Sequence, residues 1–123
     1  MKKKAGILIV AILAILAIGI LVFYGQTRIL IGASEKFNQN ELENAISCVQ
    51  KENIEFKKIW YNEEVSERIL ASFERTDFDS ENLIAIGSSF KKDNAFHENH
   101  IWILARENKS DNWRIVDNYD SEQ

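Results

Sequence analysis

The chain has 123 residues, enough for a single domain, with 46% hydrophobic residues, a net charge of −4 and one cysteine. One cysteine excludes an intramolecular disulfide, so packing must stabilise the fold. Residues 35–123 carry 11 Lys and Arg against 19 Asp and Glu, a net charge of −8. That balance argues against nucleic-acid binding, which needs a basic surface, and predicts a domain that stays clear of anionic lipid.

The chain opens with a basic and then an apolar segment. Three lysines at positions 2–4 precede residues 5–24, which contain neither a charge nor a proline. About 20 apolar residues span the hydrocarbon core as a helix, whereas the apolar part of a signal peptide has about 7–15. We therefore expect residues 1–24 to form a cytoplasmic tip and a signal anchor that contacts the lipid bilayer through residues 5–24, with cleavage as the alternative.

The flanking charges predict the orientation of this single-pass anchor in the cell membrane. Because the basic flank stays cytoplasmic, the N-terminus is expected inside and the C-terminal domain outside. Residues 25–36 are predicted to be a juxtamembrane stalk, residues 37–119 an extracytoplasmic α+β domain, and residues 120–123 a C-terminal tail. The apolar stretch 29–31 of the stalk either extends the membrane helix or docks on the domain.

Two amphipathic helices are predicted in the outer domain. Asn38 can cap the first, over 39–51, and Glu41 completes a capping box. The second follows a cap at Asn62 or Ser66, with Glu63 in its first turn. Apolar residues at helical spacing give each helix one buried face: Leu42, Ala45, Ile46 and Val49 in the first, and Val65, Ile69, Leu70 and Phe73 in the second.

Four strands complete the prediction, over 54–61, 82–90, 100–106 and 113–119, with polar loops at 91–99 and 107–112. The last three form an antiparallel meander. The fold class is therefore α+β, with two helices packed on a mainly antiparallel four-stranded sheet. Ile101 and Ile103 alternate with Trp102 and Leu104, so this strand belongs in the sheet interior, one face on helices and the other partly covered or lining a concavity.

Five segments suggest a family: FNQNELENAISCV, IEFKKIWYNEE, NLIAIGSSF, HIWILAR and NWRIVDN. Together they resemble small uncharacterised extracytoplasmic domains of Gram-positive bacteria that follow a membrane anchor or lipoprotein signal. The resemblance implies a cystatin-like or NTF2-like fold, in which a helix packs across a curved antiparallel sheet, and it brings no catalytic residues. The segment HENH, with His97 and His100, departs from the family's aromatic and small polar residues.

His97 and His100 are the candidate ligand residues that raise the question of a metal site. Zinc sites commonly need three or four converging ligands, and only two histidines are present, with Glu98 as a loose third. Residues three apart on a regular strand also point to opposite faces. We therefore predict no metal and no cofactor here, but a polar lead-in to a strand, with pH sensing as a milder alternative.

Aromatic residues are the other candidate contacts. Two of the three tryptophans are expected in the core, which leaves Trp60 and Tyr61 as an exposed pair for a ligand or partner. Cys48 is interpreted as a small core residue rather than a nucleophile. The acidic run 77–81 begins like a calcium loop but lacks the glycine and the final glutamate that the motif requires.

These features predict a membrane-tethered, non-enzymatic binding or interaction domain without catalytic residues. Its partner would be a membrane or cell-envelope protein or a small ligand. One alternative is a small hydrolase or isomerase with a pocket between helix and sheet, because cystatin-like and NTF2-like folds host both enzymes and binders. The other is a structural accessory subunit of a membrane complex.

Overall fold

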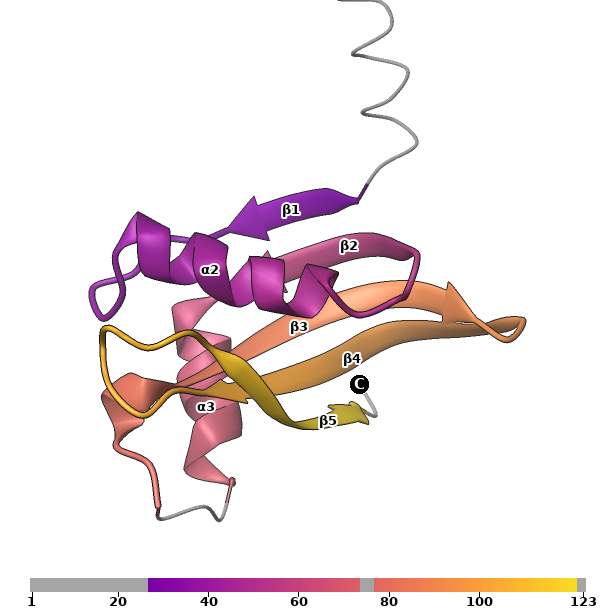
Figure 1. Cartoon of the computed structure of the whole chain (residues 1–123). Coiled ribbons are helices and arrows are strands. Elements are labelled where there is room, and N and C mark those ends of the chain that lie inside the picture. The colour runs from indigo at the N-terminus through magenta and orange to yellow at the C-terminus, as the bar shows by residue number, and fades with distance from the viewer. Residues whose placement is uncertain (1–26, 74–76, 122–123) are drawn as a thin grey trace, which may run out of the picture.

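The computed structural model of the chain describes residues 27–73 and 77–121, and it confirms the α+β class. Five strands form one sheet in the order β1–β2–β3–β4–β5 (Figure 1). The elements are β1 (Arg28–Ile31), α2 (Gln39–Gln50), β2 (Phe56–Tyr61), α3 (Glu63–Ala71), the 3₁₀ turn η1 (Ser80–Asn82), β3 (Leu83–Lys92), β4 (Ala95–Ala105) and β5 (Arg114–Asp120).

The predicted membrane anchor at 5–24 lies outside the described residues. Among the helices at 27–73 and 77–121, none combines the length and the apolar character that crossing a bilayer requires.

The predicted four-stranded sheet is wrong by one strand, because the stalk supplies β1. This strand pairs in parallel with β2, from Arg28 opposite Lys58 to Ile31 opposite Tyr61. The apolar stretch 29–31 thus docks on the domain rather than continuing a membrane helix. The other three strand pairs are antiparallel, so the sheet is mixed. Four residues show too little alternation to indicate a strand whose partner lies thirty residues away.

The predicted polar loop at 91–99 is also wrong, because β3 and β4 extend into a long hairpin. Asp93 and Asn94 form its turn with φ values of 53° and 64°. Two consecutive left-handed residues are typical of a type I′ turn, whose twist matches the flanking strands. Strand β4 consequently begins at Ala95, five residues earlier than predicted, and includes both histidines.

The two helices cover opposite faces of the sheet (Figure 1). Helix α2 has the predicted capping box at Asn38 and buries its predicted apolar face. It packs with Ile59, Ile84, Ile86, Trp102 and Leu104. Helix α3 packs on the other face, with Leu83, Ala85, Ile101 and Ile103. The second face of β4 is therefore covered by a helix along its apolar half rather than lining an open concavity.

Candidate metal centre

A β-bulge places the two histidines on the same face of β4. His100 pairs with Ser88 of β3 and His97 pairs with Phe90, so three steps along β4 match two steps along β3. The extra residue reverses the alternation of side chains between these two positions. The argument that residues three apart on a strand point to opposite faces therefore fails here, because it holds only for a regular strand.

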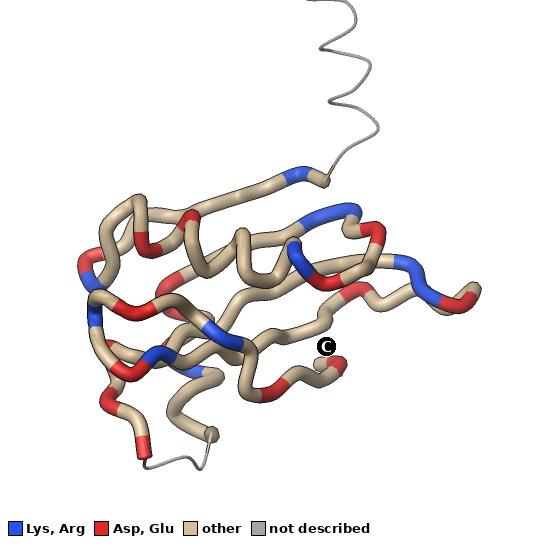
Figure 2. The backbone as a smooth tube through the Cα atoms, viewed as in Figure 1, with Lys and Arg blue, Asp and Glu red and all other residues tan. Residues whose placement is uncertain are grey.

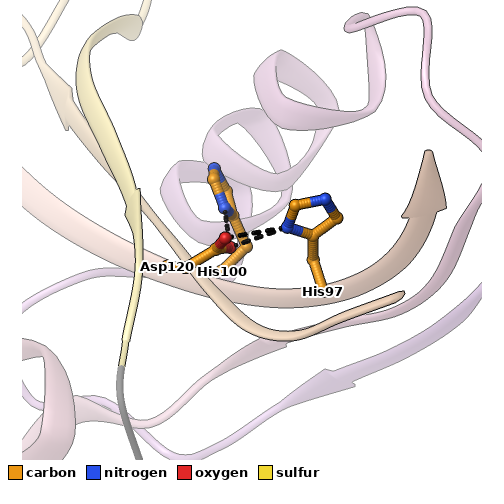
Figure 3. A group of neighbouring side chains, drawn as sticks. All are labelled: His97, His100 and Asp120. Atoms are coloured by element: carbon orange, nitrogen blue, oxygen red, sulfur yellow. Dashed lines mark hydrogen bonds and ion pairs between the residues drawn. The ribbon is translucent and has the colours of Figure 1, made fainter. Parts of the chain in front are cut away.

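Asp120 of β5 joins the two histidines. It is the cross-strand partner of His100, whose Nδ1 lies 2.6 Å from Asp120 Oδ1. His97 Nδ1 lies 2.8 Å from Oδ2 and 3.0 Å from Oδ1 of the same carboxylate. Figure 3 shows both rings directed at this carboxylate from β4. The predicted domain boundary at 119 and tail at 120–123 separated this residue from the domain, although β5 extends through it.

The second ring nitrogen of His100 is also engaged. Its Nε2 lies 2.9 Å from Oδ1 of Asn118, so both nitrogens face acceptor oxygens. A neutral imidazole has a single N–H and satisfies one of these contacts. The other contact is therefore open to a cation between Nδ1 and Asp120, or to the amide of Asn118 turned so that its NH₂ group donates to Nε2.

Aromatic rings form the floor of the cluster. The ring of His97 stacks on Phe90 with centroids 4.7 Å apart, and His100 meets the edge of Trp102 at 4.8 Å. The side chains of His97, His100 and Asp120 are 26%, 11% and 55% exposed. The cluster is consequently packed against Phe90 and Trp102 on one side and open to solvent at Asp120 and His97.

The carboxylate of Asp120 is held in its charged form. The hydrogen bond from His100 lowers the pKa of Asp120, partial burial opposes this, and the hydrogen bond and charges of the histidines lower it further. A carboxyl group binds a metal ion as the carboxylate. The residue is therefore in the ligating state at neutral pH.

These three residues fit a transition-metal site. One donor atom from each, two imidazole nitrogens and a carboxylate oxygen, lie within 4.8 Å of one another. Bonds of about 2.0–2.2 Å to zinc require such convergence, and a fourth position is left for solvent. Across residues 27–73 and 77–121, no other group of three His, Cys, Asp or Glu side chains meets this geometry.

The aromatic candidate residues differ from the prediction in which of them are exposed. Trp102 and Trp113 are buried as expected, but Tyr61 is buried too, at 2% exposure. Trp60 is partly buried on the opposite face of β2, beside α3, so the two residues do not form an exposed pair. Alternation along β2 separates them, which a count of aromatic residues does not reveal.

Cys48 has the structural environment that its sequence position predicts. Its thiol donates to the carbonyl oxygen of Trp113 at 3.3 Å. Burial raises the pKa of this thiol, although the charge of Lys51 acts in the other direction. A raised pKa leaves little thiolate, the nucleophilic form, at neutral pH.

Two shallow cavities lie on the α3 face, away from the histidines. One, of about 180 Å³, is lined by Trp60, Val65, Arg68, Ile69, Asn99, Ile101 and Ser121. The other, of about 260 Å³, is lined by Glu67, Leu70, Ala71, Phe73, Phe78, Ser80 and Leu83. The enzymatic alternative expects a pocket that contains an acid or a histidine in a perturbed environment. Neither cavity contains a histidine, and their one acid is the exposed Glu67 of the second cavity.

No protein-family model, curated protein or solved structure matches the chain. The resemblance to Gram-positive extracytoplasmic domains stays a hypothesis from the sequence segments alone.

Proposed function

We propose that the protein is a membrane-tethered, non-enzymatic domain that binds a divalent transition-metal ion through His97, His100 and Asp120. The convergence of both Nδ1 atoms on one carboxylate, at 2.6 and 2.8 Å, carries this proposal. A metal ion would replace the protons that hold these atoms together. It would also take the place of a proton on Nδ1 of His100 and leave an N–H on Nε2 for the Oδ1 atom of Asn118.

The ligand set favours particular ions. Imidazole nitrogen suits zinc, copper, nickel and iron, whereas magnesium and calcium prefer sites built from oxygen. Two nitrogens and one carboxylate therefore predict binding of Zn²⁺ or Ni²⁺ over Mg²⁺ or Ca²⁺.

Calorimetric titration of the full-length chain in detergent with Zn²⁺, Ni²⁺ and Mg²⁺ tests this proposal. We expect one Zn²⁺ per chain, and a loss of affinity of about tenfold or more in Asp120→Asn, since each 1.4 kcal/mol of lost ligation is a factor of ten. Asp117→Asn is the matched control, because Asp117 is an exposed residue of the same strand whose carboxylate caps only the N–H of Asn118. Equal affinity in the two variants would remove the site from consideration.

The proposed location follows from the sequence. Residues 5–24 are long and apolar enough to span the bilayer, and the basic residues at 2–4 favour an inside N-terminus. We place the domain on the outer face of a cell membrane, as expected for the Gram-positive family that it resembles. Protease added to intact cells should digest a C-terminal tag, and a protected tag would contradict this orientation.

A further inference from the structure

Charge is divided unevenly between one end of the domain and the rest of it. We define the anchor end as residue 28 with segments 51–58 and 91–98, which are the start of β1, the entry to β2 and the β3–β4 hairpin. It carries six Lys and Arg against four Asp and Glu. The remaining described residues carry five against thirteen. Figure 2 shows blue segments at the start of β1, in β2 and beside the hairpin turn.

Contacts across the sheet hold the anchor end together. Arg28 is the cross-strand partner of Lys58, and Lys91 is the partner of Phe96. The Nζ atom of Lys57 lies 5.9 Å from the centre of the Phe96 ring. Lys57 of β2 and Lys91 of β3 thus lie beside one aromatic side chain of β4, which is 57% exposed.

The chain length confines this end to the membrane surface. Four peptide units join Tyr24, the last residue of the apolar run, to Arg28, and they reach about 14 Å at most. The headgroup layer occupies about 5–7 Å on each side of the hydrocarbon core, and the screening length in physiological salt is about 8 Å. The start of β1 therefore lies within electrostatic reach of the headgroups.

We propose that the anchor end docks on the anionic headgroups of the membrane that holds the anchor. Arg28, Lys57, Lys91 and Lys92 face the lipid phosphates, and Phe96 enters the interface beside them, where aromatic rings are favoured. The net charge of −8 predicted a domain held away from such a surface, but most of that charge lies outside the anchor end. This inference rests on the membrane anchor of the proposed function and requires no bound metal, although His97 of the candidate metal centre lies within the anchor end.

Fluorescence quenching in reconstituted vesicles tests the docking. The full-length chain with Cys48→Ser receives one labelled cysteine, either Ala95→Cys at the hairpin or Asn112→Cys in the loop at the other end of β4. The vesicles contain phosphatidylcholine alone or mixed with phosphatidylglycerol, together with a lipid that carries a headgroup quencher. We expect quenching at position 95, stronger with phosphatidylglycerol and lost in high salt, and none at position 112.

Charge reversal supplies the matched control. The triple variant Lys57→Glu, Lys91→Glu, Lys92→Glu should lose the salt-sensitive quenching at position 95. The variant Arg68→Glu, Lys109→Glu, Arg114→Glu changes the net charge equally at exposed sites elsewhere and should keep it. Quenching at position 95 that ignores phosphatidylglycerol, or that equals quenching at position 112, overturns the docking. Protein that leaves the vesicle fraction overturns the anchor itself, and the docking with it.

Discussion

The indole ring of Trp60 lies directly on the backbone of Gly87. These residues are cross-strand partners on β2 and β3, and a Cβ atom at position 87 would fall 2.1 Å from ring atoms Cε2 and Cζ2 of Trp60. No real Cβ atom sits this close to another heavy atom. Gly87 is therefore required by the space that the ring fills, not by its backbone conformation.

Replacing Gly87 by alanine should destabilise the domain through this contact. The ring must leave its position, and such overpacking costs about 1–3 kcal/mol. Urea unfolding of the wild type and of Gly87→Ala measures the loss. In a Trp60→Val background the same substitution should cost much less, because the clashing ring is gone. An equal cost in both backgrounds would contradict the contact.

A buried arginine at the end of β4 should be a second centre of stability. The Arg106 side chain is 2% exposed and lies 2.6 Å from Oε2 of Glu41. It also donates to Asn82 Oδ1 and to the carbonyl oxygen of Glu81, and its guanidinium lies 4.3 Å from the centre of the Trp113 ring. Because Arg106→Ala leaves Glu41 without its partner, we expect a loss of about 3–5 kcal/mol.

The conservative replacement Arg106→Lys tests the geometry of this contact. Lysine keeps the charge but lacks the planar fork that reaches several acceptors at once and stacks on the indole. Denaturant melts should place Arg106→Lys well below wild type. Arg114→Lys is the control, because Arg114 is exposed and its ion pair with Glu107 lies at the surface. Similar unfolding midpoints for the two lysine variants would argue against a special role for the buried guanidinium group of Arg106.

Acid should destabilise the domain through two carboxylates besides that of Asp120. Burial acts to raise the pKa of Glu41, but hydrogen bonds from Asn38 and Arg106 and nearby positive charge outweigh it, so the pKa lies below 4.5. Hydrogen bonds from the Ser34 hydroxyl and the N–H of Glu35 are the main causes of the lowered pKa of Glu63. A lowered folded-state pKa gives stability that is full above pH 4.5 and lost as pH falls through the folded value.

The variants Glu41→Gln and Glu63→Gln check this pH dependence. Each removes one carboxylate that must gain a proton, so stability should fall less steeply below pH 4.5 than in wild type. Urea midpoints collected from pH 3 to pH 7 give the comparison, with Glu43→Gln on the exposed side of α2 as control. Unchanged slopes in both variants would place the acid sensitivity elsewhere.

Most of the fold could be predicted from local patterns. The capping box at Asn38 and the apolar face of α2 need only helical spacing, and β4 needs only its apolar alternation. The strand β1 could not be predicted, because its four residues are defined by a partner far along the chain. The β3–β4 turn has the positive-φ residues Asp93 and Asn94 in place of the glycine that usually indicates a hairpin.

The sequence indicated two of the three residues of the candidate site. His97 and His100 are conspicuous, but their common orientation depends on a bulge that no residue type indicates. Asp120 lies twenty residues later in the chain, and the register of β5 with β4 places it opposite His100. A carboxylate in a predicted tail carries no sign of this pairing, so the third ligand comes from sheet topology alone.

Tyr61 should titrate as a buried phenol. Burial is the main cause that raises its pKa to about 12, and the charge of Glu63 adds to it. The ultraviolet absorbance of phenolate during an alkaline titration should therefore contain a late component that Tyr61→Phe removes. A phenol that ionises near pH 10 would instead return Tyr61 to the surface as a candidate contact.

Asn118 should set the metal affinity without touching the metal. Its Oδ1 lies 2.9 Å from Nε2 of His100, and an N–H on Nε2 directed at this oxygen would leave Nδ1 as the ligating atom. Loss of such a partner typically weakens metal binding by about 10–100-fold, so Asn118→Ala should bind Zn²⁺ that much more weakly. Asn118→Asp keeps an acceptor at this position and should restore the affinity, since a carboxylate also fixes the tautomer.

Nitrogen NMR of the imidazoles separates this positioning role from a structural one, because Asn118→Ala should change the tautomer of His100 and leave that of His97 unaltered. Weakened binding that Asn118→Asp does not rescue, with an unchanged His100 tautomer, would exclude the positioning role.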